Sequence, residues 1–326
     1  MIRRYQAVAQ EVRKPNGKIV LRVDAPCPCG SGKAIVACHL DTDGRLRKQR
    51  PSLRPPGPKT GYSHPRCYLR GCNDCSQQIS REHYISQSIL AQLGETIRGA
   101  GMPWLKPGEI FEASVGSLAA NILCRRHNEA LSPLDTEAGL FFSILKTALI
   151  DLNRKTLSRK PIFHLVCGDA IELWMLKVAC GLYFSIGSKD GAKVANTHSI
   201  DLGKVQRAFF DGIWDARAGL YFRGSTGSRI TVSYEVGMSP IVMGSNVQFG
   251  GATVSLLGFT MDLLFDSANT GSDGWSALVN RPSELVLKRK RRRHTIILTR
   301  PPGTPERAVV MEEGRPPERT DLALIL

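Results

Sequence analysis

The segments Ile79-Ser-Arg-Glu-His-Tyr-Ile-Ser86 and Asn121-Ile-Leu-Cys-Arg-Arg-His-Asn128 decide how the first half of this chain is interpreted. Apolar and polar residues alternate in the first segment, which predicts a short strand. The second segment predicts a loop that opens into a helix. The pair Cys72-Asn-Asp-Cys75 comes before both, and Leu131-Ser-Pro-Leu-Asp135 follows them. Side chains that can bind metals or move protons therefore recur in a fixed order between residues 67 and 135.

This order of a C-x2-C pair, an acid–histidine pair and Asn-x2-Cys-x2-His-Asn resembles the HNH, or ββα-metal, nuclease family over residues 67–135. The resemblance implies a structural Zn²⁺ with four ligands, namely Cys72, Cys75, Cys124 and His127. Cys67 is an alternative to Cys72 in this set. His127 could instead be the last catalytic residue of the motif, which would leave the zinc ion with three ligands unless Cys67 joined it.

The resemblance also implies a catalytic divalent ion, Mg²⁺ or Mn²⁺. Glu82 and Asn128 would bind this ion, His83 would be the general base, and Asn121 would be the middle Asn of the motif. These residue types suit phosphodiester hydrolysis. A neutral imidazole can deprotonate water, and carboxylate and amide oxygens are suitable ligands for Mg²⁺ or Mn²⁺.

A second metal-binding pattern lies earlier in the chain. Cys27, Cys29, Cys38 and His39 have the spacing C-x-C-x8-C-H, and their soft or borderline donors suit tetrahedral zinc. The pattern resembles the SEC-C motif, which implies a closed structural site that contacts protein or ribosome. The neighbouring Gly-Ser-Gly-Lys is not a phosphate-binding Walker A loop, because Cys27 and Ala34 stand where that loop needs glycine and Ser or Thr.

Charge and composition narrow the class of protein. The formal net charge of +15 favours a polyanionic partner, since each Lys or Arg placed on a phosphate releases counterions. No apolar stretch is long enough for a membrane span, and the N-terminus lacks the apolar segment of a secretory signal. We therefore expect a cytoplasmic protein whose cysteines bind zinc rather than form disulfides.

The predicted fold class is α+β, with an antiparallel sheet in the C-terminal part. Five segments are predicted: N-terminal strands and the SEC-C-like zinc knuckle (1–40), a basic, proline-rich linker (41–66), the HNH module (67–135), an α+β domain (136–300) and a flexible tail (301–326). The linker either follows a phosphate backbone or is simply solvated. Apolar spacing predicts helices over 137–153, 169–184 and 205–215, with strands after them.

A run of six cations, Lys288-Arg-Lys-Arg-Arg-Arg293, lies between two β-like segments. A hairpin that presents these side chains could bind a nucleic-acid backbone through phosphate contacts. Alternatively, the run protects an edge strand from pairing with another chain.

These observations together predict a metal-dependent HNH endonuclease that acts on nucleic acid, with double-stranded DNA expected before RNA. Small bacterial HNH proteins with accessory domains often act in phage defence or mobile elements. The resemblance therefore suggests such a role by association alone. The alternative is a non-catalytic zinc adaptor that docks protein or ribosome through both zinc sites.

Overall fold

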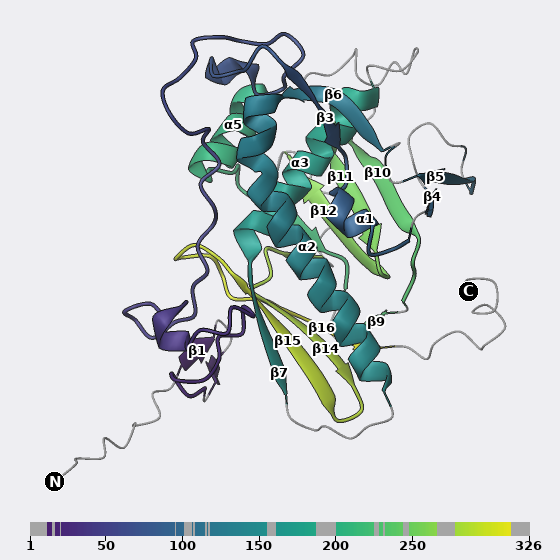
Figure 1. Ribbon diagram of the computed structural model, residues 1–326. Helices are drawn as coiled ribbons and strands as arrows, with labels where there is room; N and C mark the ends of the chain where they lie inside the picture. Colours follow the sequence, from purple (N-terminus) through teal and green to yellow (C-terminus); the bar gives the residue numbers. More distant parts are fainter. Residues whose placement is uncertain are drawn as a thin grey trace.

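The computed structural model describes residues 12–14, 17–19, 21–94, 96–100, 106, 108–114, 116, 118–154, 161–186, 200–224, 228–230, 232–243, 248–265 and 278–313 (Figure 1). It is a mixed α+β protein, as the sequence predicts. Two long helices cross its centre, with one sheet below them and another behind them in the view of Figure 1. Within the described residues, no helix has the length and apolar character needed to cross a membrane.

The N-terminal part is a small unit that packs on the C-terminal sheet. Its elements are β1 (Val12–Lys14), β2 (Gly17–Ile19) and the 3-10 helix η1 (Ile35–Ala37). Buried Cys27, Ile35 and Leu46 form one apolar cluster with Leu165 and Ile297, which belong to two strands of that sheet. The zinc knuckle is therefore attached to the rest of the molecule by apolar contacts.

The basic linker, residues 41–66, contains no helix or strand and lies against the helices. Lys48 Nζ donates to both carboxylate oxygens of Glu137 at 2.6 and 2.7 Å. Arg54 forms an ion pair with Asp211 at 2.8 Å. Part of the linker's positive charge is therefore neutralised within the protein rather than presented to solvent.

A β-hairpin-like pair followed by a helix forms the centre of the first half of the chain. β3 (Ile79–His83) pairs antiparallel with β6 (Ala119–Cys124), and α2 (Arg125–Asn153) begins at the next residue. The remaining elements here are η2 (Arg70–Cys72), α1 (Gln87–Leu90), β4 (Thr96–Ala100) and β5 (Ile110–Ser114). α2 buries Leu131, Leu134, Phe141 and Leu145, whose spacing of three to seven residues gives a helix one apolar face.

The described residues of the second half add two further helices and two mixed sheets. The helices are α3 (Gly168–Ile186) and α5 (Leu202–Asp211). The seven-stranded sheet has the order β13-β8-β12-β11-β10-β4-β5, and the five-stranded sheet has the order β7-β15-β14-β16-β9. Their strands are β7 (Ile162–Cys167), β8 (Gly219–Phe222), β9 (Ser228–Ile230), β10 (Val236–Met243), β11 (Gln248–Leu256), β12 (Phe259–Leu264), β13 (Val279–Asn280), β14 (Glu284–Arg289), β15 (Arg292–Thr299) and β16 (Ala308–Glu313).

Two expectations about organisation need correction. The predicted boundary between residues 135 and 136 falls inside α2, and buried residues from both sides of it form one hydrophobic cluster. Part of the predicted flexible tail is β16, which pairs parallel with both β14 and β9. Val309 and Met311 are buried on one face of β16, so the apolar alternation within the Pro- and Glu-rich composition explains this strand. Residues 314–326 lie outside the described residues.

A histidine pair at the lower end of α2 makes unfolding depend on pH. His164 Nε2 and His294 Nδ1 lie 3.1 Å apart, and His294 Nε2 lies 3.0 Å from Asp151 Oδ2. Burial, and then the neighbouring His294, lower the pKa of His164 to about 4.

Because the unfolded chain takes up a proton on His164 near pH 6.5 and the folded chain does not, stability from this residue is lost as pH falls from about 6.5 to 4. We expect His164→Gln to weaken the decline in the free energy of unfolding over that range. Urea unfolding at several pH values measures it, and parallel curves for variant and wild type would contradict the assignment.

Candidate functional site

Four ligand atoms meet where β3, β6 and α2 join. Cys67, Cys75, Cys124 and His127 are all buried, and their donor atoms lie within 4.8 Å of one another. His127 Nδ1 is 3.5 Å from Cys67 Sγ, 3.7 Å from Cys75 Sγ and 3.2 Å from Cys124 Sγ. A tetrahedral zinc ion with normal bond lengths needs S···N separations of about 3.6 Å. This donor set therefore fits zinc.

Cys67, and not Cys72, completes this group of four. The resemblance had implied Cys72 as the ligand, with Cys67 as the alternative. The four-residue group does not include Cys72, which is half-buried at the end of η2 and packs against the hydrophobic core. Because η2 turns the chain between these two residues, Cys67 faces Cys124 and His127 while Cys72 does not join them. The pKa of Cys124 is lowered to about 3 by a hydrogen bond from the Cys67 thiol and further by His127. A thiolate suited to zinc is thus stabilised within the group.

The N-terminal group has the composition predicted from the sequence. The ligand atoms of Cys27, Cys29, Cys38 and His39 lie within 4.8 Å of one another. His39 Nδ1 is 3.4 Å from Cys27 Sγ and 3.1 Å from Cys38 Sγ, and the two sulfurs of Cys29 and Cys38 are 3.7 Å apart. These separations also fit a closed tetrahedral zinc site without a free position for substrate.

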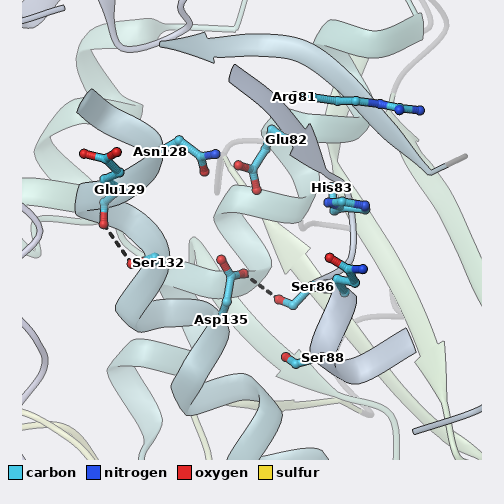
Figure 2. A pocket seen from close by; sticks show the side chains of 10 residues that line it. Arg81, Glu82, His83, Ser86, Ser88, Asn128, Glu129, Ser132 and Asp135 are labelled. Atoms are coloured by element: carbon cyan, nitrogen blue, oxygen red, sulfur yellow. Dashed lines mark hydrogen bonds between the residues drawn. The ribbon is translucent and has the colours of Figure 1, made fainter. Parts of the chain in front are cut away.

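A pocket of about 340 Å³ opens beside the second zinc group, between β3, α1 and α2. Figure 2 shows Glu82 and His83 entering it from the end of β3, with Asn128 and Asp135 facing them from α2. Ser86 and Ser88, which follow β3 in the chain, also line the pocket with their hydroxyl groups. The pocket thus gathers three of the four residues expected to be catalytic.

Glu82 lies at the floor of this pocket, and its side chain is already paired with a cation. One of its oxygens, Oε1, is 2.6 Å from Nζ of Lys177, which comes from α3 and is only 3% exposed. Lys177 Nζ also donates to Asp135 Oδ2 at 2.5 Å. Burial raises the pKa of Glu82 to about 7, and the Lys177 ammonium opposes this rise. Burial alone would lower the pKa of Lys177, but its two carboxylate neighbours raise it. We take the lysine to be charged.

His83 and Asn128 leave reactive atoms on the pocket side. Asn128 Nδ2 donates to Ser80 Oγ at 2.8 Å, so the amide oxygen is its remaining polar atom. Within the described residues, no hydrogen bond reaches Asn128 Oδ1 or Glu82 Oε2. Burial lowers the pKa of His83, and the cations Arg81 and Lys177 lower it further. His83 is therefore a neutral imidazole at pH 7.

Asn121, the fourth residue expected at the centre, does not reach the pocket. It is exposed on β6 and does not line the pocket. The β3–β6 register shifts between Ser80 and Glu82, so Asn121 and Ile122 together oppose Arg81 as a β-bulge. The bulge re-aims the end of β3, but the Asn121 side chain itself is not part of the pocket.

The cationic run forms the tip of the β14–β15 hairpin, and two of its six cations form ion pairs within the described residues. Lys288 pairs with Glu312 at 3.0 Å, and Arg289 pairs with Glu313 at 3.4 Å. Arg292 donates to the Asp151 carbonyl oxygen and Arg293 to Thr295 Oγ1. Lys290 and Arg291 are exposed at the turn, and no ion pair to either is found in the part of the chain that the structure describes. Arg293 is exposed as well, with its Nε bonded to Thr295, so this end of the hairpin presents Lys290, Arg291 and Arg293 to a partner.

Sequence reasoning assigned no role to Asp135, Ser86 and Lys177. Asp135 follows Asn128 by seven residues, so two helical turns place both on one face of α2, a signal that the sequence contains. Lys177 is the single cation of α3 and is surrounded in sequence by apolar residues, and a buried lysine requires a partner of opposite charge. Which carboxylates it meets depends on tertiary packing.

The chain matches no protein-family model, no curated protein and no solved structure.

Proposed function

We propose that this chain is a metal-dependent endonuclease of the HNH type that hydrolyses phosphodiester bonds in nucleic acid, with DNA as the first substrate to test. One observation carries the proposal: Asn128, which is 45 residues further along the chain, lines a single pocket with Glu82 and His83 at the junction of a strand pair and a helix. A Cys₃His group that fits zinc braces the same junction. The N-terminal zinc-type group would serve contact with a protein partner, and we expect the enzyme to act in the cytoplasm.

The donors that remain free in the pocket suit a hard divalent cation. Glu82 Oε2 and Asn128 Oδ1 are oxygens, the ligand type that Mg²⁺ and Mn²⁺ prefer, and water could complete the coordination. When bound, such an ion would polarise a phosphate oxygen and stabilise the leaving oxygen. The Glu82, His83 and Asp135 side chains do not form a preformed close group of three metal ligands within the described residues. The binding site would therefore be an open one.

His83 supplies the proton chemistry in this proposal. As a neutral imidazole it accepts a proton from a water molecule, whose oxygen then forms a bond to phosphorus. The bond between phosphorus and the leaving oxygen breaks, and that oxygen takes a proton from solvent. Asn128, held by Ser80, and Glu82, held by Lys177, would keep the scissile phosphate beside His83.

A cleavage assay on supercoiled plasmid tests the proposal. Zinc-loaded protein is expected to nick the plasmid with Mg²⁺ or Mn²⁺ and to leave it intact when neither ion is added. Structured RNA, assayed in parallel, identifies the preferred nucleic acid. If no cation among Mg²⁺, Mn²⁺ and Ni²⁺ supports cleavage of either substrate, the non-catalytic adaptor is the better account of the two zinc-type groups.

The hairpin tip provides a separate prediction about binding. Each cation that contacts a phosphate contributes about 0.9 to the slope of log affinity against log salt. The double variant Lys290→Ala/Arg291→Ala should therefore lower the magnitude of that slope by about 2 for duplex DNA. Fluorescence anisotropy at several salt concentrations measures it. Lys33→Ala/Lys106→Ala, which removes two exposed lysines elsewhere, is the matched control. Equal slopes for both double variants would show that the hairpin tip does not touch DNA.

A further inference from the structure

Lys177 lies behind two carboxylates of the pocket and comes from α3, a helix outside the HNH-like segment. Its Nζ lies 2.6 Å from Glu82 Oε1 on β3 and 2.5 Å from Asp135 Oδ2 on α2. The two carboxylates come from different elements, and α3 packs against both β6 and α2. A single ammonium therefore fixes Glu82 and Asp135, two of the three acidic side chains of the pocket, relative to each other.

The position of Asp135 is itself fixed from the other side. Ser86 Oγ donates to Asp135 Oδ1 at 2.5 Å and accepts from the indole nitrogen of Trp174 at 2.8 Å. Trp174 is fully buried and, like Lys177, belongs to α3. Figure 2 shows the Ser86–Asp135 hydrogen bond below the Glu82 carboxylate. A continuous chain of polar contacts thus runs from the core of α3 through Ser86, Asp135 and Lys177 to Glu82.

This series of polar contacts leaves one oxygen of Glu82 available. Oε1 is held by Lys177, so the carboxylate cannot rotate without breaking a buried ion pair, which costs about 3–5 kcal/mol when one partner is lost. Oε2 has no hydrogen bond from the described residues and lies in a pocket with Asn128 Oδ1.

We propose that Lys177 is a positioning residue of this pocket: it holds Glu82 by one oxygen so that the other oxygen, together with Asn128 Oδ1, binds a divalent cation. This inference rests on the proposed function. Residues behind the direct ligands of a metal typically change its affinity by 10- to 100-fold when they are replaced.

Positioning and simple electrostatics predict opposite results when the lysine is removed. An ammonium close to a bound cation repels it, so if Lys177 acted only through its charge, Lys177→Met would tighten cation binding. If Lys177 acts by holding Glu82, the same substitution frees the carboxylate and weakens binding. Because Lys177 also lowers the pKa of Glu82, the two proteins are compared at several pH values above 7. A weakening that persists as the pH rises identifies positioning, whereas one that disappears reflects protonation of Glu82.

The test is Mn²⁺ binding to the full, zinc-loaded chain, measured by the electron paramagnetic resonance signal of free Mn²⁺ without nucleic acid. Wild type should bind one Mn²⁺, and Lys177→Met should bind it at least about 10-fold more weakly. Lys146→Met is the matched control. It removes a partly buried lysine from α2 that donates to the Gln92 carbonyl oxygen, away from the pocket, and should bind Mn²⁺ like wild type.

Lys177→Met leaves two carboxylates without their cation and could fail to fold, which zinc content and thermal unfolding would reveal. Ser86→Ala covers that case, because it keeps every charge and removes only the hydrogen bonds of Ser86 to Asp135 and from Trp174. A loss of Mn²⁺ affinity in Ser86→Ala of about 3-fold or more supports positioning.

If Lys177→Met folds, unchanged or tighter Mn²⁺ binding overturns the inference. If Lys177→Met does not fold, wild-type Mn²⁺ affinity in Ser86→Ala overturns it. Wild type that binds Mn²⁺ but never cuts nucleic acid overturns the proposed function alone, and the variants still decide the role of Lys177. Wild type that binds no Mn²⁺ overturns both.

Discussion

Replacing Cys67 by serine is expected to remove one of two zinc ions from the protein and to abolish folding of the β3–β6–α2 junction. The zinc group draws its ligands from the chain before η2, the chain before β3, the end of β6 and the first turn of α2. Binding of a structural zinc ion contributes about 10–16 kcal/mol to folding in small zinc domains, and a serine hydroxyl is a poor replacement for a thiolate. The loss therefore exceeds the stability of a typical domain.

Cys72→Ser is the matched control for this prediction. Cys72 lies in the same knuckle but outside the four-residue group, so its serine variant should keep two zinc ions per chain. Native mass spectrometry gives the stoichiometry, and thermal unfolding gives the stability. A Cys72→Ser variant that loses a zinc ion, beside a Cys67→Ser variant that keeps two, would restore the ligand set that the C-x2-C pattern first suggested.

The second large effect concerns His83→Ala. In the proposed reaction this substitution removes the group that takes the proton from water, and loss of a general base lowers rates by about 10²- to 10⁴-fold. His83 is half-buried at the end of β3, with no role in either zinc group, so the variant should keep two zinc ions and wild-type thermal stability. His64→Ala, which removes another half-buried histidine, should cut at the wild-type rate.

The pH dependence gives an independent check on His83. Burial and neighbouring cations lower its pKa below the ordinary value near 6.5, so the imidazole stays neutral to a lower pH than a free histidine does. Because the pKa of Glu82 is raised to about 7, Mn²⁺ is kept saturating at every pH so that protonation of this ligand does not mask the imidazole. Cleavage should then persist below pH 6.5 and fall only when the lowered pKa of His83 is reached. A rate that already halves above pH 6.5 would contradict this role, as would a His83→Ala variant with wild-type activity.

Local patterns predicted the elements of this molecule well. The period of apolar residues predicted helices over 137–153 and 169–184, where α2 and α3 are found, and the alternation in Ile79–Ser86 predicted β3. The helix expected to open within Asn121–Asn128 and the helix expected over 137–153 are one helix, α2, which begins at Arg125 and continues through Pro133.

The pocket could be predicted only in part, for a physical reason. Residues within one motif, such as Glu82 and His83, are neighbours in sequence, and Asn128 follows a recognisable spacing. The choice between Cys67 and Cys72 depends on the 3-10 turn η2, which reverses the chain between them. The Lys177–Glu82 pair depends on how α3 packs against β6 and α2, and no local pattern carries that information.

The central claim is that Glu82, His83 and Asn128 surround one divalent cation. It is tested most directly by diffraction from crystals of the zinc-loaded protein soaked in Mn²⁺, with anomalous data collected at the manganese edge. We expect a manganese peak in the pocket, coordinated by Glu82 Oε2 and Asn128 Oδ1 and facing His83. A well-ordered pocket without manganese, or a peak elsewhere on the molecule, would contradict the claim.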